Sequence, residues 1–558
     1  MKEMNYWNRL LARRLSRRRA LQAAAVGGAG LAAGGIVACG DDDDSAKQTA
    51  ATEAPKAAAT TAATAAPAVL KPTGTVTVVQ GVDANTVDPQ FVNATPETTI
   101  LNHVFDSVLW RDAKTLKPVP WAAESFKNVD PLTWEFKLRP NMKFHDGTPV
   151  DAEAAKFSLE RWATETIGGK PTVPRPRRTV SYDKTEVVDA LTFRIKTTGP
   201  SPTLTDQLTA VRLVPPSAYK DESEGNLAKV AAKPVGSGPY KFVEWKKDQQ
   251  FVVEVNNDWW GPKQAFEKIA FKPVGETATR ILQLTSGEAD LIVNVPPDNA
   301  PDIDKSDKAR ISKVQGLRKI FVGIRTEKHP ALADKRVRQA MNYALNFDAM
   351  NKALLDGIGK RMPTYFNPPH EPPDAKAFPY DAAKAKALLA EAGYASGLSI
   401  EMHAPTGRYI KDKEIAQALA QDLEKAGLKI DLKILEWSVY AGKELTKAGG
   451  GPPAGLYFVG LGAPVNGQDE AFFFHKDYQL NFTDWKHDEY HALFDKLKVE
   501  MDEKKFQEII NQMNKILWDE VPWIGIYNQV DLYGVSKKLV WEARADERIA
   551  MFEAKWKA

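Results

Sequence analysis

The sequence predicts an α/β fold with mixed sheets, because segments with a strand pattern alternate with segments of helical periodicity along the chain. A first strand is expected at residues 75–80, which are rich in β-branched residues. A second strand is expected at residues 133–138, where Trp134, Phe136 and Leu138 alternate with polar neighbours. Such alternation is typical of a strand with one buried face.

Residues 398–434 contain the clearest unit of this kind. A strand at residues 398–402 is followed by an expected loop at residues 403–408, and a second strand with alternating apolar residues occupies residues 428–434. Between them, three apolar residues recur at a spacing of four along a helix: Ile415, Leu419 and Leu423. Gly427 is expected to end that helix. Such a βαβ crossover predicts two parallel strands.

Length and composition set limits on the class of protein. A chain of 558 residues is longer than one hydrophobic core usually serves, so at least two lobes are expected. The 75 Lys and Arg residues nearly balance the 72 Asp and Glu residues, and several of the positive charges lie in the first nineteen residues. This argues against a nucleic-acid-binding surface. Because Cys39 is the single cysteine, no intrachain disulfide and no cysteine-based zinc site can form.

Residues 1–39 read as an export signal with a lipid anchor. Residues 16–21 resemble a twin-arginine export motif, in which Ala20 replaces the usual Phe, so both twin-arginine and Sec export stay open. Residues 36–40 resemble a bacterial lipobox, which predicts cleavage before Cys39 and acylation of that residue. A plain signal peptide and a single transmembrane anchor are the alternatives. The Ala-, Thr- and Pro-rich residues 40–73 are expected to form a disordered linker.

Residues 132–161 resemble the signature of the family 5 extracellular solute-binding proteins, the dipeptide- and oligopeptide-binding type. Several further motifs of this family follow in the right order and at the right spacing: Val87-Asp88-Pro89 and residues 234–240, 286–290, 335–340 and 380–394. The resemblance covers nearly the whole chain after the linker.

The resemblance implies a two-lobe periplasmic-binding-protein fold with an extra subdomain in lobe I and a hinge between the lobes. By this analogy, lobe I comprises residues 74–316, lobe II comprises residues 317–524, and residues 525–558 return to lobe I. The chain would cross the hinge near Gly316 and Gly525.

The implied function is that of the substrate-binding component of an ABC importer. Such a protein is a monomer that captures a peptide or another small organic solute and delivers it to a permease and ATPase complex. The lipid anchor on Cys39 would hold it at the outer face of the cytoplasmic membrane. No cofactor, metal or nucleic acid is expected. Binding of a non-peptide solute (an oligosaccharide, an opine or a metal chelate) and a sensory or chaperone-like role without transport remain alternatives.

The candidate ligand site lies in lobe II, beyond the carboxyl ends of its strands. Arg408 follows the strand at residues 398–402 and precedes a helix, so it could clamp a carboxylate near free backbone N–H groups; a solvent-exposed loop arginine is the alternative. Trp437 and Tyr440 follow the next strand and are expected in the cleft wall.

A family segment that binds the amine of a peptide ligand is altered in this chain. The pattern G-W-x-x-D is matched by Gly460, Leu461, Gly462 and the two residues after them, so Leu461 replaces the Trp and Pro464 replaces the Asp. Because a buried ammonium needs a carboxylate, either Asp469 or Glu470 substitutes or the ligand has no free amine. Nearby aromatic residues would suit a sugar, although a core role is the commoner one: Tyr457, Phe458, Phe472, Phe473 and Phe474.

An enzyme is not expected. His145 and Asp146 are adjacent, but neighbouring residues of an extended chain point to opposite faces, and Asp-Gly is a common turn dipeptide. The sequence contains no nucleophile elbow, phosphate loop or H-E-x-x-H motif.

Overall fold

The structure, a computed structural model, describes residues 72–92, 94–172, 181–445, 451–462, 465–478 and 481–557. Cys39, the twin-arginine-like motif, the linker up to residue 71 and Pro464 lie outside the described residues. The chain divides after residue 70, and Lys71–Ala558 forms one compact unit.

The largest sheet has eleven strands among the described residues and mixes parallel and antiparallel pairs. Its path is β10 (Tyr240–Lys246), β11 (Gln250–Val255), β12 (Lys268–Pro273), β1 (Thr75–Gln80), β13 (Leu291–Ile292), β19 (Trp523–Ser536), β14 (Ala309–Ile324), β18 (Leu456–Gly462), β16 (Leu398–Thr406) and β17 (Leu428–Glu436), with β15 (Lys360–Arg361) on β19. β1 is parallel to β12 and β13, and β16 is parallel to β17 and β18. The predicted α/β class with mixed sheets is confirmed.

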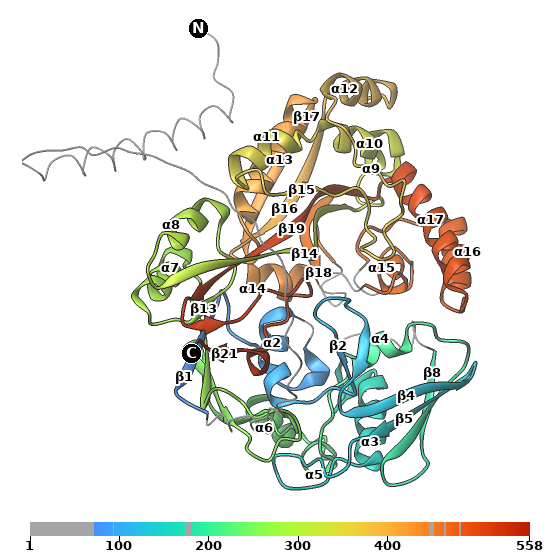
Figure 1. The fold of residues 1–558 in the computed structure, drawn as a ribbon. Helices are drawn as coiled ribbons and strands as arrows, with labels where there is room; N and C mark the ends of the chain where they lie inside the picture. The colour runs from blue at the N-terminus through green and yellow to red at the C-terminus, as the bar shows by residue number, and fades with distance from the viewer. Residues whose placement is uncertain are drawn as a thin grey trace, which may run out of the picture. The chain divides into compact units, whose positions relative to one another are not determined.

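Two long strands, β14 and β19, run antiparallel through the middle of this sheet (Figure 1). One half of the pair adjoins β13, whereas the other half of β14 pairs with β18. The register of β14 against β19 shifts between Gln315 and Lys319, and again between Ile320 and Phe321. Gly316 lies within the first irregularity, and Gly525 pairs with Phe321 at the second.

A separate antiparallel sheet has its own hydrophobic core. Its strands are β4 (Ala123–Asp130), β5 (Thr133–Leu138), β9 (Thr192–Thr197) and β8 (Tyr182–Val187). Helix α3 (Ala152–Ala163) begins where the Asp151 side chain accepts a hydrogen bond from the Ala154 N–H, and it buries Leu159 and Trp162 in this core. Figure 1 shows α3 beside β4 and β5.

The remaining elements surround the sheets. The longer helices are α2 (Thr95–Val104), α6 (Glu224–Ala232), α7 (Thr277–Ser286), α10 (Lys335–Ala344), α11 (Phe347–Leu354), α12 (Ala382–Glu391), α13 (Asp412–Lys425), α16 (Asp488–Leu497) and α17 (Glu503–Glu520). Shorter elements are α4 (Leu204–Leu208), α5 (Pro216–Tyr219), α8 (Ala300–Asp304), α9 (Pro330–Ala333), α14 (Trp437–Val439), α15 (Gln468–Phe472), β2 (Leu109–Arg111), β3 (Pro118–Pro120), β6 (Thr166–Ile167), β7 (Lys170–Pro171), β20 (Leu539–Val540) and β21 (Lys555–Trp556). Within the described ranges, no helix has the length and apolar character needed to span a bilayer.

The strands and helix predicted from periodicity are confirmed. β1 and β5 have the predicted bounds, and β16, α13 and β17 form the βαβ unit with parallel strands. Gly427 has a φ of 107° just after α13, a left-handed conformation that suits glycine and ends the helix. The loop begins later than expected. β16 continues to Thr406 because residues 403–406 still pair with β17.

Two of the family motifs meet in a buried ion pair. The Asp88 carboxylate accepts two hydrogen bonds from the Arg161 guanidinium, at 2.9 and 2.8 Å, and both side chains are almost fully buried. Arg161 also lies over the Tyr219 ring, 5.1 Å from its centroid. This pair fixes α3 against the segment that leads into α2.

A second buried carboxylate, Asp106, forms no ion pair with a cation among the described residues. The indole N–H groups of Trp121, Trp259 and Trp260 donate to it at 2.9, 3.3 and 3.1 Å. Burial raises the pKa of Asp106 to about 6. Neutral donors stabilise the carboxylate less than a cation would, so the protonated form of Asp106 is favoured up to a higher pH.

This raised pKa predicts a pH dependence of stability. At pH 5 the folded protein holds a proton on Asp106 that the unfolded chain releases, because the pKa of the unfolded group is near 3.8. Between pH 7.5 and pH 5, the free energy of unfolding of the wild type should therefore rise by about 1 kcal/mol relative to Asp106→Asn. Urea unfolding of both proteins at the two pH values measures this. The same pH dependence in both would show that Asp106 titrates normally.

Candidate ligand-binding site

A cavity of about 560 Å³ lies where α2, α4, β14, β18 and the segment after β19 come together. Its volume suits a small organic molecule. Its charged lining consists of four arginines and four carboxylates: Arg111, Arg318, Arg408, Arg548, Asp206, Asp469, Asp546 and Glu547. A ligand can pair only with those charges that the protein does not neutralise itself.

Arg318 and Glu547 form the most buried of these ion pairs. Arg318 donates from Nε and Nη2 to the two carboxylate oxygens of Glu547, at 2.6 and 2.5 Å. Its Nη1 donates to the Gly460 carbonyl at 2.9 Å, and Nη2 also donates to the Thr95 hydroxyl at 3.1 Å. Although burial lowers it, the charge and hydrogen bonds of Glu547 raise the pKa of Arg318. Arg318 therefore remains charged, and its guanidinium is held by Glu547, Gly460 and Thr95.

Two further arginines of the lining are paired. Arg111 donates to Asp206 at 3.1 Å and to the Thr209 hydroxyl at 3.3 Å. Arg548 approaches Asp546 at 3.5 Å, but Asp546 makes shorter contacts of 2.9 Å with Arg544. The pairing of Arg548 is thus the weaker of the two.

Arg408 lines the cavity without a carboxylate partner. Its guanidinium lies over the rings of Tyr409 and Trp437, 5.1 and 5.5 Å from their centroids, and it makes no ion pair or hydrogen bond with any described residue. Burial, followed by the charge of Arg318, lowers the pKa of Arg408. A partly buried cation of this kind gains free energy when an anion binds beside it.

The backbone around Arg408 differs from the expectation. The N–H groups of Arg408, Tyr409 and Lys413 donate to the Asp412 carboxylate at 2.9, 3.0 and 2.9 Å. Asp412 thus occupies the position at the start of α13 where the sequence predicted an external anion. Binding of an anion at this loop would rest on the side chain of Arg408.

The two aromatic residues after β17 have different positions. Trp437 is half-buried, lines the cavity and supports Arg408. Tyr440 is fully buried, its hydroxyl donates to the Phe458 carbonyl at 2.8 Å, and it does not line the cavity. The expectation of Tyr440 in the cleft wall therefore does not match this structure, because its hydroxyl satisfies a strand carbonyl in the core.

Gly460, Leu461 and Gly462 end β18 at the cavity. The Gly460 carbonyl accepts from both Arg318 and the Tyr409 hydroxyl, each at 2.9 Å. A Cβ atom at Gly460 would lie 2.6 Å from side-chain atoms of Ile320 and Tyr409. A side chain at this position would therefore have to displace Ile320 and Tyr409.

Asp469 and Glu470, the two candidate partners of a ligand amine, face different surroundings. Asp469 lines the cavity and accepts from the side-chain amides of Gln207 and, at 3.0 Å, Asn466. No described cation lies within ion-pair distance of it, and burial raises its pKa. Glu470 is fully buried and accepts from the N–H groups of Asn367 and Gly467 at 2.8 and 2.7 Å. The geometry therefore favours Asp469.

Of the five aromatic residues in β18, in α15 and directly after α15 that could suit a sugar, only some reach the cavity. Tyr457 and Phe473 line it, although both are more than nine-tenths buried. Phe458, Phe472 and Phe474 are buried and do not line it. None of the five offers an open ring face, so these residues act as core.

Several lining residues were not found from the sequence. Arg318, Thr95 and Gln207 stand in segments without a distinctive motif. The dense run of charges from Arg544 to Arg548 near the C-terminus was the one available signal. The described residues hold no cluster of His, Cys, Asp and Glu that could bind a metal.

Comparison with known proteins identifies the family to which this chain belongs. The family model described as bacterial extracellular solute-binding proteins, family 5 Middle, matches residues 117–475. The glutathione-binding protein GsiB of Pectobacterium atrosepticum is 27% identical over 487 residues, which cover 83% of this chain and 90% of that protein. The oligopeptide-binding protein AppA of Bacillus subtilis, solved with a nonapeptide, has a TM-score of 0.78 at 22% identity, covering 88% of this chain and 100% of the other. AgaA of A. tumefaciens, solved with agropinic acid, has a TM-score of 0.74 at 24% identity, covering 87% and 99%.

The two arginines beside Tyr409 should differ sharply in their effect on stability. Arg318→Met leaves Glu547 buried without its partner and should lower the free energy of unfolding by about 3–5 kcal/mol. Arg408→Met removes a guanidinium that forms no ion pair within the part of the chain that the structure describes, and it should cost less than about 1 kcal/mol. Urea unfolding of the two variants tests this, with the double variant Arg318→Met, Glu547→Gln expected to recover part of the loss. Equal costs for the two single variants would contradict the assignment.

Proposed function

Because the chain belongs to family 5 of the bacterial extracellular solute-binding proteins, we propose that its cavity captures a small zwitterionic solute and delivers it to an ABC permease. The family and the fold are those of substrate-binding components rather than of enzymes. The choice of solute rests on two side chains of the lining, Arg408 and Asp469, that have no ion-pair partner among the described residues.

These two side chains are complementary to the two charged groups of a peptide. Arg408 can form a bidentate contact with a carboxylate. Asp469 can accept hydrogen bonds from an ammonium group in place of those it now accepts from the side-chain amides of Gln207 and Asn466. A ligand with both groups would neutralise both charges. A neutral sugar would leave them uncompensated in a partly buried site.

The names of similar proteins support a peptide-like solute. They include a glutathione-binding protein and an oligopeptide-binding protein. Asp469 offers a carboxylate even though Pro464 stands at the family's amine-binding position. A free amine on the ligand is therefore compatible with this chain.

We also propose that two lobes close on the solute, with lobe I at residues 74–316 and 525–558 and lobe II at residues 317–524. Two hydrogen bonds would then bridge the lobes next to the cavity: Thr203 Oγ1 to Gln468 Oε1 at 3.1 Å, and Gln207 to Asp469. The irregular register of β14 and β19 at Gly316 and Gly525 supports a hinge there.

Binding to dipeptides tests the proposed function directly. Calorimetric titration with a panel of L-dipeptides should show measurable affinity, and Arg408→Gln and Asp469→Asn should each weaken it by about 30-fold or more. N-acetylated dipeptides should bind weakly to the wild type and should be insensitive to Asp469→Asn, because they carry no ammonium.

A matched control comes from the same loop. Lys411 forms an ion pair with Asp298 at 3.1 Å and does not line the cavity, so Lys411→Gln should leave the affinity unchanged. Full affinity in both Arg408→Gln and Asp469→Asn would remove these residues from the site. The absence of any bound solute in native mass spectra, together with no binding from the panel, would contradict the proposed function.

Outside the described residues, we propose that Cys39 carries the lipid anchor and that residues 16–21 direct twin-arginine export. The support is the sequence itself, since the single cysteine stands at the end of a lipobox-like segment. Cys39→Ser should move the protein from the membrane fraction to the soluble fraction of its host, because acyl chains would no longer hold it. Fractionation followed by immunoblotting measures this, and unchanged membrane partitioning would refute the anchor.

A further inference from the structure

Tyr409 is held in place through both its backbone and its hydroxyl. Its backbone N–H donates to the Asp412 carboxylate at 3.0 Å, and its hydroxyl donates to the Gly460 carbonyl at 2.9 Å. The ring also packs closely against Gly460, where a Cβ atom would lie 2.6 Å from Cε1 of the ring. Only 7% of the residue is exposed. The ring of Tyr409 is therefore a fixed part of the cavity wall.

Two arginines lie over this ring. The guanidinium carbon of Arg408 is 5.1 Å from the ring centroid, and that of Arg318 is 5.7 Å from it. Arg318 is also held by its ion pair with Glu547. The guanidinium of Arg408 has no ion pair or hydrogen bond with any described residue, so it is held by aromatic rings. The ring of Tyr409 is nearer to it than that of Trp437, which is 5.5 Å away.

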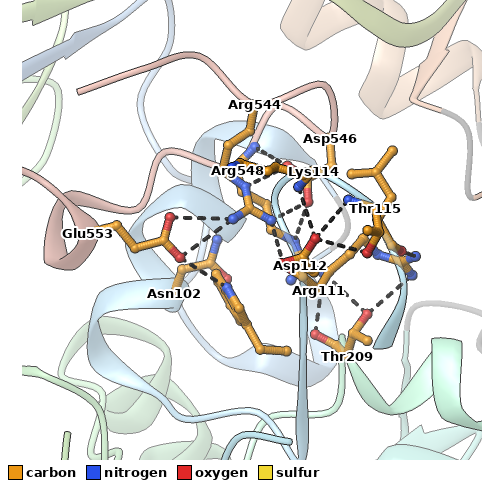
Figure 2. Close-up of polar contacts among 12 residues, drawn as sticks. Asn102, Arg111, Asp112, Lys114, Thr115, Thr209, Arg544, Asp546, Arg548 and Glu553 are labelled. Atoms are coloured by element: carbon orange, nitrogen blue, oxygen red, sulfur yellow. Dashed lines mark hydrogen bonds and ion pairs between the residues drawn. The ribbon is translucent and has the colours of Figure 1, made fainter. Parts of the chain in front are cut away.

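Two other arginines of the lining are held in a different way. Figure 2 shows Arg111 and Arg548 among hydrogen-bonding side chains. Both donate to the Thr209 hydroxyl at 3.3 Å, and Arg548 also approaches Asp546 at 3.5 Å. Such contacts use the donors of a guanidinium. A ring face attracts a guanidinium without using its N–H groups, so Arg408 keeps its donors for a ligand.

Two carboxylates of the protein attract Arg408 as well. Burial lowers the pKa of Arg408 most, and the charges of Glu547 and Glu97 act in the opposite direction. Glu97 lies in α2, and its Oε2 is buried without a hydrogen-bond partner among the described residues. An arginine side chain has enough rotamer freedom to turn toward such a group. Without the ring of Tyr409, Arg408 would therefore be drawn away from the cavity.

We propose that Tyr409 is a positioning residue of the ligand site, whose ring holds the Arg408 guanidinium at the cavity with its N–H groups free for a carboxylate. Tyr409 acts through Arg408 and not through a contact of its own with the solute. This inference rests on the proposed function, because it takes Arg408 as the residue that binds a carboxylate. It goes beyond that function by assigning the selectivity for a free carboxylate to the ring of Tyr409.

Two probes that differ only in the carboxylate test this role. L-Alanyl-L-phenylalanine has a terminal carboxylate, whereas L-alanyl-L-phenylalaninamide has none. In calorimetric titration the wild type should bind the free acid at least about 30-fold more tightly. Tyr409→Leu should reduce this preference to about 3-fold or less, mainly by weakening the binding of the free acid. Tyr409→Phe retains the ring and should keep the preference within about 3-fold of the wild-type value.

Tyr440 provides a matched control. Its hydroxyl also donates to a carbonyl of β18, that of Phe458, but it does not line the cavity. Tyr440→Leu should leave the preference unchanged, which separates positioning of Arg408 from a general loss of stability. Thermal unfolding shows whether each variant is folded, and Tyr409→Met takes the place of Tyr409→Leu if the latter does not fold. A preference that persists in Tyr409→Leu, or that Tyr409→Phe loses equally, would overturn the inference.

Crystal structures of the variants without ligand test the inference independently of the solute. In Tyr409→Leu, the Arg408 guanidinium should lie within about 4 Å of a carboxylate oxygen of Glu97 or Glu547, whereas in Tyr409→Phe it should stay at the cavity. An unmoved Arg408 in Tyr409→Leu would contradict the inference even if the affinity falls. If Arg408 moves as expected but the wild type binds neither probe nor any dipeptide of the panel, the inference stands and the proposed function is wrong. If the wild type binds the free acid but neither Arg408 nor the preference changes, only the inference is wrong.

Discussion

Arg318 and Glu547 meet in a nearly dry part of the molecule, and their ion pair holds together segments that are far apart in the chain. Arg318 lies on β14, Glu547 follows β19, and the same guanidinium also contacts Thr95 at the start of α2 and Gly460 at the end of β18. The additional hydrogen bonds of Arg318 to Gly460 and Thr95 help to offset the cost of burying the ion pair. Both residues of the pair line the cavity.

The ion pair also shapes the chemistry of the cavity by using up two of its charges. Arg111 and Asp206 neutralise each other in the same way. The protein is thus left with a few charged groups whose hydrogen-bonding capacity is not used internally. In a partly buried site, such groups have a large influence on which ligands bind. A charge that is buried without a partner costs binding free energy, whether it belongs to the protein or to the ligand.

Local sequence predicted much of the fold. The bounds of β1 and β5 follow from alternation of apolar residues, and the βαβ unit that ends at β17 follows from a helical period closed by Gly427. The loop after β16 begins later than predicted, because residues 403–406 have no apolar pattern of their own and are held by pairing with β17. Pairing partners along the sheet are not visible in a local pattern.

For the site, the sequence by itself determined the family resemblance, the loop that carries Arg408, and the question of whether Asp469 or Glu470 could replace the missing Asp at Pro464. Only the tertiary structure decided that Glu470 is occupied by backbone N–H groups while Asp469 faces the cavity, and that Tyr440 belongs to the core. The physical reason is that a charged side chain is available to a ligand only if its neighbours leave it unsatisfied. Those neighbours come from segments hundreds of residues away, such as Gln207 beside Asp469, so only the folded chain brings them together.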